Sequence, residues 1–213
     1  MSADTSACQA EPSSRIDNAR AYDAISDDWQ RSRNAGTVNA CIVDFVKRLK
    51  PNGRVLDVGC GTGYPIAQYL SSCHFFVTGI DISHAMIQKA KALHVPHAEF
   101  IQQDFLDYTS DRLYDGIIAF DSLWHIAKEK QPAIYPKLAS LMRPGAYVLF
   151  THGKRDGETT GMMYDQEFYY SALEAEEVRL LMAQAGLATL SLTENYREPT
   201  TGDRDLLVIA QKQ

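Results

Sequence analysis

The stretch VLDVGCGTG, from Val55 to Gly63, decides how the rest of the sequence is interpreted. A short apolar run breaks into three alternate glycines, which is typical of a buried strand ending in a tight turn before a helix. Such a turn either lets a ligand approach the main chain or only packs a helix closely on a sheet. Asp57 lies near the end of this strand, where a buried carboxylate needs hydrogen bonds from loop amides or from a ligand.

The composition is that of an ordinary globular protein. The 213 residues are 45% hydrophobic and 23% charged, with a formal net charge of −6. Nucleic-acid-binding proteins usually carry a basic face, so this charge favours a small-molecule partner over a nucleic acid. The four cysteines show neither CxxC spacing nor a histidine pattern typical of a metal site. We therefore expect free thiols and no metal. The protein is expected to be a monomer or homodimer.

Neither a signal peptide nor a membrane span is expected. The first residues, MSADTSACQAEPSS, are polar, and no later run approaches the roughly 18 apolar residues that a membrane helix needs. These features predict a cytoplasmic protein with no membrane partner. We expect a disordered tail over residues 1–14 and a single domain over residues 15–213.

Strand patterns alternate with helical patterns along the chain. After the strand at Val55, further strands are expected at 75–81, 98–104, 114–121 and 146–152. Helical spacing predicts helices within 16–33, 38–49, 65–70, 83–93 and 130–142. This alternation predicts right-handed βαβ units and an open α/β sheet. Two β-like stretches, 187–196 and 206–211, predict a closing hairpin.

The alternation of strand and helix patterns stops after the fifth expected strand. Residues 153–170 are turn-rich at first and then dense in methionine and aromatic side chains. Ser171 and Glu174 have the spacing of a capping box, which predicts a helix that Gly186 ends.

Four carboxylates stand at the predicted strand ends: Asp57, Asp81, Asp104 and Asp121. Ligands of open parallel sheets bind beyond the carboxyl ends of the strands. Asp81 follows the glycine turn by about one helix and one strand, where a carboxylate can accept both hydroxyls of a ribose. Each aspartate alone could be a solvated strand end, but four on successive strands beside a glycine loop indicate a nucleoside site.

With these motifs in place, the sequence resembles the class I S-adenosylmethionine-dependent methyltransferases, of the small-molecule type. The resemblance runs from Val38 to the C-terminus through VLDVGCGTG, GIDIS, QQDF, YDGIIAFDSLWHI and LMRPGAYVLF. It implies a Rossmann-like open sheet of about seven strands, mostly parallel with an antiparallel last strand, and helices on both faces. The GxGxxG spacing of a dinucleotide site is missing, because Tyr64, Pro65 and Ile66 follow the third glycine.

The resemblance implies a set of donor-binding residues along the strand ends. The residues expected to contact the methionine part of S-adenosyl-L-methionine are Gly59, Gly61, Gly63, Asp121 and Ser122. Asp57 would orient the loop or hold the ammonium group. Toward the ribose and adenine the expected residues are Asp81, Ile82, Asp104 and Phe105. Residues 15–50 would form an N-terminal helical lid, with Tyr22 or Arg33 reaching the donor carboxylate and Trp29 near the substrate. Simple packing of these aromatic side chains on the sheet edge is the alternative.

Two histidines could act as a general base, which methyl transfer needs only when the acceptor carries a proton. His125 follows the fourth expected strand and His152 ends the fifth; each could also be an ordinary polar residue. The segment 153–170 is expected to cap the substrate with Met162, Tyr164, Tyr169 and Tyr170, since aromatic walls suit a flat or cationic acceptor. Core packing or a dimer contact would give the same composition.

The predicted function is methyl transfer from S-adenosyl-L-methionine to a small-molecule acceptor by in-line displacement, with S-adenosyl-L-homocysteine as product. The fourth-strand exit reads DSLW and lacks the Pro-Pro-aromatic and Pro-Cys signatures of nucleic-acid methyltransferases. Two alternatives stay open: another transferase on the same cofactor fold, such as an aminopropyl or carboxymethyl transferase, or a non-catalytic regulator that binds the same cofactor.

Overall fold

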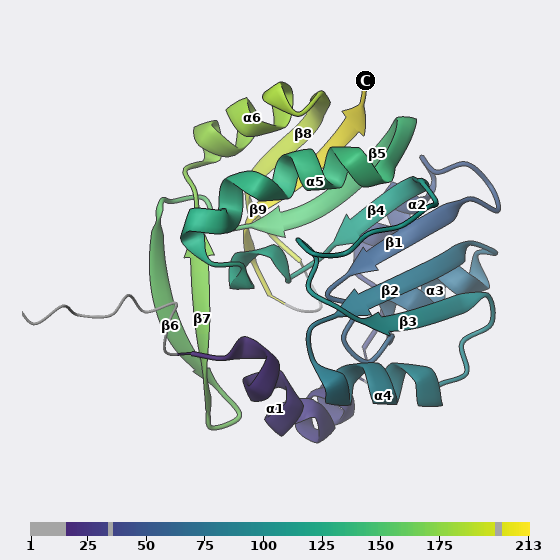
Figure 1. Ribbon diagram of the computed structural model, residues 1–213, viewed down its shortest axis with the longest axis vertical. Coiled ribbons are helices and arrows are strands. Elements are labelled where there is room, and N and C mark those ends of the chain that lie inside the picture. Colours follow the sequence, from purple (N-terminus) through teal and green to yellow (C-terminus); the bar gives the residue numbers. More distant parts are fainter. Residues whose placement is uncertain (1–15, 34–35, 199–201) are drawn as a thin grey trace, which may run out of the picture.

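The structure, a computed structural model, describes residues 16–33, 36–198 and 202–213, so the tail expected over 1–14 lies outside the described residues. A seven-stranded sheet with the strand order β3-β2-β1-β4-β5-β9-β8 forms its centre (Figure 1). The strands are β1 Arg54–Val58, β2 Phe76–Asp81, β3 Ala98–Gln102, β4 Tyr114–Ala119, β5 Met142–His152, β8 Leu187–Tyr196 and β9 Arg204–Lys212.

The direction of the strands follows the prediction. β1 to β5 pair in parallel, and β9, the last strand of the chain, runs antiparallel to both β5 and β8. β8 and β9 form the expected closing hairpin. The predicted mostly parallel sheet with an antiparallel last strand is therefore confirmed.

Helices cover both faces of the sheet, as the sequence predicts. α2 (Ala40–Val46), α3 (Ile66–Ser72) and α4 (His84–Ala92) share one core with Val55 of β1. α5 (Ile134–Leu141) and α6 (Ala175–Gln184) share the other core with Leu56 and Val58. Successive residues of β1 thus point to opposite faces, and both faces are buried, which explains the continuous apolar run of its sequence.

The predicted capping box at the last helix is wrong. Ser171 lies in a strand, and its hydroxyl donates to the carbonyl oxygen of Ile126 at 2.6 Å. α6 begins at Ala175, with Glu174 as its N-cap residue and no side-chain capping bond. A serine N-cap is found instead at Ser83, whose hydroxyl accepts from the Met86 amide at the start of α4.

The segment after β5 forms a separate hairpin of β6 (Gly157–Met163) and β7 (Gln166–Ala172). Tyr164 and Asp165, both at positive φ, make its two-residue turn. The hairpin stands beside the sheet, next to the single N-terminal helix α1 (Asn18–Arg33) (Figure 1). Phe168 of β7 is fully buried against Ala21 and Ile25 of α1, in a small cluster of its own.

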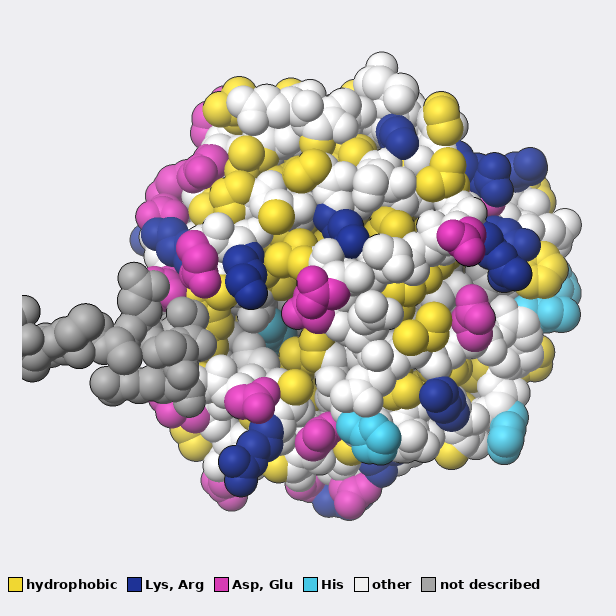
Figure 2. All heavy atoms as spheres, in the orientation of Figure 1, with side chains coloured by type: hydrophobic (Ala, Val, Ile, Leu, Met, Phe, Trp, Pro, Cys, Tyr) yellow, Lys and Arg dark blue, Asp and Glu magenta, His cyan; other side chains and the backbone are white. Residues whose placement is uncertain are grey.

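On the outside of the molecule, acidic and basic side chains are interspersed over the face drawn in Figure 2. This face carries no broad basic stripe of the kind that nucleic-acid binding requires. Within the described part of the chain, no helix is long and apolar enough to cross a membrane.

Candidate active site

A cleft opens at the carboxyl ends of β1 to β4, the edge at which open α/β sheets bind ligands. Its cavity has a volume of about 210 Å³ and is covered on one side by α1. Most of the residues that the sequence singled out line it: Tyr22, Trp29, Arg33, Gly59, Gly61, Asp81, Ile82, Asp104, Phe105, Asp121, Ser122 and His125.

The glycine loop is fixed by the end of β2. The amides of Gly59 and Cys60 donate to the carbonyl oxygen of Ile80 at 2.8 and 3.0 Å. The two carboxylate oxygens of Asp81 then accept from the Gly61 amide at 2.8 Å and from the Ser83 amide at 2.9 Å. Asp81 therefore joins the loop to the start of α4 and lines the cleft at the same time.

Gly63 has a different place from the other two glycines. It lies outside the cleft lining, and a β-carbon at this position would stand 2.9 Å from the ring of Phe100. Gly63 thus allows the loop to pack closely against the sheet. The structure brings Gly59 and Gly61, but not Gly63, to the ligand side of the turn.

Two buried carboxyl groups lie under the loop. Burial raises the pKa of Asp81 to about 6. Burial, and then the charge of Asp81, raise the pKa of Asp57 to about 7. Asp57 does not line the cavity, yet its Oδ2 is buried without a hydrogen-bond partner among the described residues. The missing partner agrees with the raised pKa of Asp57, because no described residue donates to this oxygen to stabilise the ionised form.

The end of β3 supplies the far wall of the cleft. Asp104 is exposed on the lining and accepts from the Leu106 amide at 2.7 Å, which fixes the turn after the strand. Phe105 is buried behind it.

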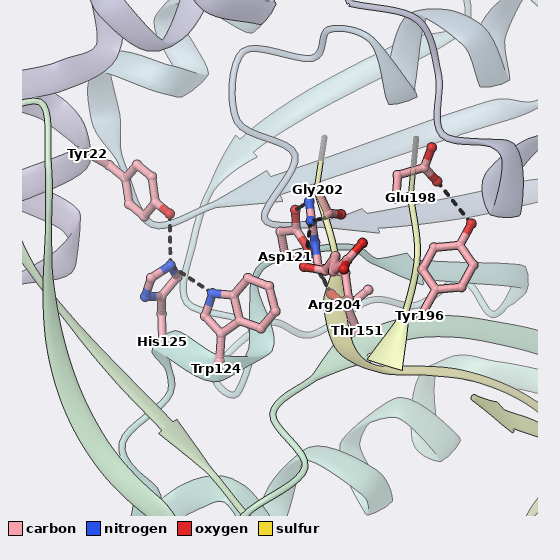
Figure 3. Close-up of polar contacts among 10 residues, drawn as sticks. Tyr22, Asp121, Trp124, His125, Thr151, Tyr196, Glu198, Gly202 and Arg204 are labelled. Carbon is pink, nitrogen blue, oxygen red and sulfur yellow. Dashed lines mark hydrogen bonds and ion pairs between the residues drawn. The ribbon is translucent and has the colours of Figure 1, made fainter. Parts of the chain in front are cut away.

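Asp121, at the end of β4, is held by an arginine that the sequence did not indicate. Nε of Arg204 donates to Oδ1 of Asp121 at 2.5 Å and Nη2 donates to Oδ2, while the Thr151 hydroxyl lies 3.2 Å from Oδ1. Figure 3 shows the guanidinium between this carboxylate and the loop at Gly202. The positive charge of Arg204 thus balances the negative charge of Asp121 in an ion pair. The backbone of Asp121 has a φ of +59°.

His125, on the short turn η2 (Leu123–His125), meets the N-terminal helix in the cleft wall. Its Nε2 lies 2.8 Å from the hydroxyl of Tyr22 and 3.3 Å from the indole nitrogen of Trp124 (Figure 3). Burial lowers the pKa of His125 to about 4, so the imidazole is neutral at physiological pH. Burial also raises the pKa of the Tyr22 hydroxyl.

His152 is not part of this cleft. It is fully buried, with Nε2 at 2.8 Å from the side-chain oxygen of Gln131 and Nδ1 at 2.7 Å from the Gly153 carbonyl oxygen. Both ring nitrogens are engaged within the fold, on the side of a second cavity that also touches Arg204. The structure therefore separates the two histidines that the sequence offered as candidates for a general base.

The predicted substrate residues are scattered over the β6–β7 hairpin. Met162 and Tyr164 lie near its tip, with exposed fractions of 68% and 44%. Tyr169 is buried, and its hydroxyl donates to Glu158. The ring of Tyr170 lies 4.9 Å from that of His125. None of these four residues lines the cleft, and Tyr170 borders the second cavity.

The remaining lining residues were missed by the sequence reasoning. Those from loops and helix starts are Asn39, Cys60, Tyr64, Pro65, Ile66, Gln103, Leu106, Ile126, Ala127 and Lys130, and the buried floor adds Val58, Ile80, Met86, Phe120 and Leu123. Cys60, Gln103 and Ile126 lie within the motifs VLDVGCGTG, QQDF and YDGIIAFDSLWHI, and this place in the motifs is the signal that could have identified them. Among residues 16–33, 36–198 and 202–213, no cluster of three His, Cys, Asp or Glu side chains could hold a metal ion.

Comparison with known proteins identifies the family. The family model described as "Methyltransferase domain" matches residues 30–192, which is most of the chain. The chain belongs to the class I S-adenosylmethionine-dependent methyltransferases. This confirms the resemblance drawn from the glycine loop and the strand-end carboxylates.

The methyltransferase chain is similar to a number of curated proteins, and two of them illustrate the range. One is an O-methyltransferase, cnsE, from Penicillium expansum, with 29% identity over 69% of this chain and 57% of the relative. Another is thiocyanate methyltransferase 1 from Brassica oleracea, with 30% identity over 54% of this chain and 47% of the relative. The chain thus spans about half the length of these two relatives.

Solved structures share the fold. Magnesium protoporphyrin IX methyltransferase from Synechocystis PCC 6803, with bound S-adenosylmethionine, superposes with a TM-score of 0.71 over 96% of this chain and 99% of that one. The identity is 20%, so this likeness concerns the fold of the methyltransferase alone.

Proposed function

We propose that this methyltransferase domain transfers the methyl group of S-adenosyl-L-methionine to a small-molecule acceptor. The observation that carries the proposal is Asp81, which lines the cleft beside the glycine loop and is fixed by the Gly61 and Ser83 amides. A carboxylate so placed suits the two hydroxyls of a ribose.

The residues present fit this donor. Asp81 would accept the ribose hydroxyls, with Ile82, Asp104 and Phe105 around the adenine. Asp57 would orient the loop from the inside of the fold, because it is buried and does not line the cavity. Gly59 leaves room for Ser122, which takes the place that a β-carbon would fill, and Gly61 faces the Trp29 indole nitrogen at 3.4 Å from its own β-carbon position. On the α1 side of the cleft, the guanidinium carbon of Arg33 lies 4.4 Å from the centre of the Trp29 ring. This guanidinium would bind the carboxylate of the donor.

The donor supplies a methyl group on a positively charged sulfur, which needs neither a metal nor a covalent intermediate. The chain's part is to align the acceptor and to exclude water, and alignment alone is worth up to about 7–11 kcal/mol of the barrier. α1 would act as the lid, because its side chains line the cleft. Asp23 of α1 holds the helix against the start of α4 by accepting hydrogen bonds from the Ser83 hydroxyl and the Ala85 amide. α2, also within the predicted 15–50 lid segment, packs in the core, so the lid proposal is restricted to α1.

We also propose a cytoplasmic location, which is supported by the free thiols of Cys41, Cys60 and Cys73. The protein would act as a monomer or homodimer.

Donor affinity should fall as the pH falls below about 6. The pKa of Asp81 is raised to about 6, and a protonated carboxyl is a poorer acceptor for the ribose hydroxyls. Binding that requires the ionised form is therefore lost on the acidic side of this pKa, by up to about tenfold per pH unit. Asp57, with a raised pKa as well, acts in the same direction.

Calorimetric titration with S-adenosyl-L-methionine at several pH values between about 5 and 8 measures this dependence. The variant Asp81→Asn should give a flatter profile, since it cannot ionise. An affinity that is constant, or that increases toward low pH, would contradict the role given to Asp81.

Formation of S-adenosyl-L-homocysteine in the presence of a panel of small acceptors tests the proposed function. We expect acceptor-dependent product formation together with a methylated acceptor in the mass spectrum. Donor binding without turnover on any acceptor would favour a non-catalytic regulator, and transfer of another group from the donor would favour a different transferase.

A further inference from the structure

A second cavity, with a volume of about 470 Å³, lies beside the cleft at the ends of β1 to β4. Its lining comes from the turn η2, the end of β5, the β6–β7 hairpin and the start of β9. None of the residues expected to bind the donor is among those that line it. Sites for small molecules measure about 300–1,000 Å³, so this cavity is large enough to hold one.

The cleft and the second cavity share a wall that is one pair of side chains thick. Trp124 lines the second cavity and His125 lines the cleft, and the indole nitrogen of Trp124 lies 3.3 Å from Nε2 of His125. Arg204 lines the second cavity and Asp121 lines the cleft, and these two residues form an ion pair. Figure 3 shows both contacts. A molecule in the second cavity therefore lies directly behind the donor cleft.

The two contacts in this wall differ in strength. Arg204 donates from Nε and Nη2 to both carboxylate oxygens of Asp121, and from Nη1 to two carbonyl oxygens of the loop before it. Such bidentate, charge-assisted bonds are among the strongest in proteins. Within the described part of the chain, Trp124 makes a single hydrogen bond, which is long and ends on a neutral imidazole. Trp124 is therefore the side chain that can turn aside and join the two spaces.

The floor of the second cavity has its polar groups engaged within the fold. Both ring nitrogens of His152 lie within 2.8 Å of protein oxygens, and the Ser171 hydroxyl donates to the Ile126 carbonyl oxygen at 2.6 Å. Burial also lowers the pKa of His152, so the ring is neutral at physiological pH. Recognition of a ligand is thus left to the charged rim and the aromatic walls of the cavity.

The rim of the second cavity has an excess of negative charge. The exposed carboxylates that line it, called here the acidic rim, are Glu158, Asp203 and Asp205. Two positive side chains, Arg155 and Arg204, line the cavity as well. Asp121 balances the charge of Arg204 from the other side of the wall, so Arg155 alone faces the three carboxylates of the rim. The local field therefore favours a cation.

Two aromatic rings line the inner part of the cavity. Trp124 belongs to the shared wall, and the ring of Tyr170 lies 4.9 Å from that of His125, against the same wall. The faces of such rings attract a cation by about 0.5–2 kcal/mol. The aromatic walls and the acidic rim thus favour the same kind of ligand.

We propose that the second cavity is the acceptor site and that it selects a small acceptor carrying an ammonium group. The proposal rests on the proposed function, whose acceptor class it names. A quaternary or protonated ammonium nitrogen has no lone pair with which to attack a methyl group, so the attacking atom is a different atom of the same acceptor. That atom faces the wall at Trp124, while the ammonium group lies between the aromatic rings and the acidic rim.

The two tryptophans of the chain locate the bound acceptor, because one lines each space: Trp29 the cleft and Trp124 the second cavity. Trp29→Phe leaves Trp124 as the fluorescent reporter, and Trp124→Phe leaves Trp29. Each variant, with S-adenosyl-L-homocysteine bound, is titrated with meta-hydroxyphenyltrimethylammonium. We expect a saturable change in the emission of Trp124 and a much smaller one in that of Trp29. A response of Trp29 without a response of Trp124 would place the acceptor in the cleft and overturn the proposal.

The charge preference is measured on the wild-type protein with S-adenosyl-L-homocysteine bound. Calorimetric titrations at about pH 7, where phenols keep their proton, compare three phenols with a trimethylammonium, a tert-butyl or a carboxylate group in the meta position. We expect the cationic phenol to bind at least about tenfold more tightly than the neutral one, with a preference that falls as salt is added. Equal binding of all three would overturn the proposal. Tightest binding of the carboxylate would do so as well, and would assign the selection to Arg155.

The variant Asp203→Asn/Asp205→Asn removes two charges of the acidic rim and keeps the size of both side chains. It should bind the cationic phenol about three- to tenfold more weakly, with the neutral phenol and S-adenosyl-L-homocysteine bound as in the wild type. The matched control is Asp44→Asn/Asp111→Asn, which removes the same charge at exposed positions outside both cavities. An equal loss in the control would contradict selection by the rim. Failure of the wild type to bind S-adenosyl-L-homocysteine would instead refute the proposed function itself.

Discussion

Replacing Asp81 by alanine should weaken the binding of S-adenosyl-L-methionine by about 100-fold or more, since hydrogen bonds to a charged group contribute about 1.5–3 kcal/mol each. The variant loses the acceptor for both ribose hydroxyls. It also frees the Gly61 and Ser83 amides, which the carboxylate fixes at 2.8 and 2.9 Å. Calorimetric titration of wild type and variant measures the difference.

The fold should survive this change, because removing a carboxyl group whose burial raises its pKa relieves a desolvation cost. Circular dichroism and the thermal midpoint check that point. Asp111→Ala, at an exposed position away from the cleft, is the matched control and should bind the donor as the wild type does. Unchanged affinity in a folded Asp81→Ala protein would refute the ribose role.

Gly59→Ala should destabilise the protein by about 2–5 kcal/mol, from positive-φ strain and overpacking together. Gly59 has a φ of +72°, and a β-carbon there would stand 2.3 Å from that of Ser122. Because Ser122 lies beside the loop at the end of β4, relief of this overlap requires the loop to move. We therefore expect a lower thermal midpoint and a loss of donor binding.

Two further variants separate strain from overlap. Gly145 has a φ of +78° with nothing within 4 Å of its β-carbon position, so Gly145→Ala should cost only about 1–2 kcal/mol. In the double variant Gly59→Ala/Ser122→Gly the overlap is removed, and the protein should regain the difference. Equal destabilisation by Gly59→Ala and Gly145→Ala, measured by urea unfolding, would show that the contact with Ser122 is not what fixes the loop.

The central sheet could be predicted because its signals are local. The run at Val55 and the apolar stretch at 114–119 are continuous because both faces of the sheet are covered, and the turns between them are marked by glycine and proline. The β6–β7 hairpin was not recognised. Its turn is Tyr164–Asp165 rather than a glycine pair, and β6 is mostly exposed, so neither turn chemistry nor alternation marks it.

The candidate site was predictable where it follows from strand ends. Asp81, Asp104 and Asp121 come together because parallel strands end at one edge. Contacts between distant segments left no trace in the sequence, as with Arg204 and Asp121, which are 83 positions apart. His152 and Gly63 fit the sequence pattern but do not reach the cleft. His152 ends β5 and Gly63 lies in the turn after β1, and both pack into the fold instead.

The central claim is that this cleft holds S-adenosyl-L-methionine. The most direct measurement is a calorimetric titration of the wild-type protein with this donor, followed by competition with S-adenosyl-L-homocysteine. We predict saturable binding of one donor per chain, displaced by S-adenosyl-L-homocysteine. A folded protein that binds neither compound at millimolar concentration would contradict the account.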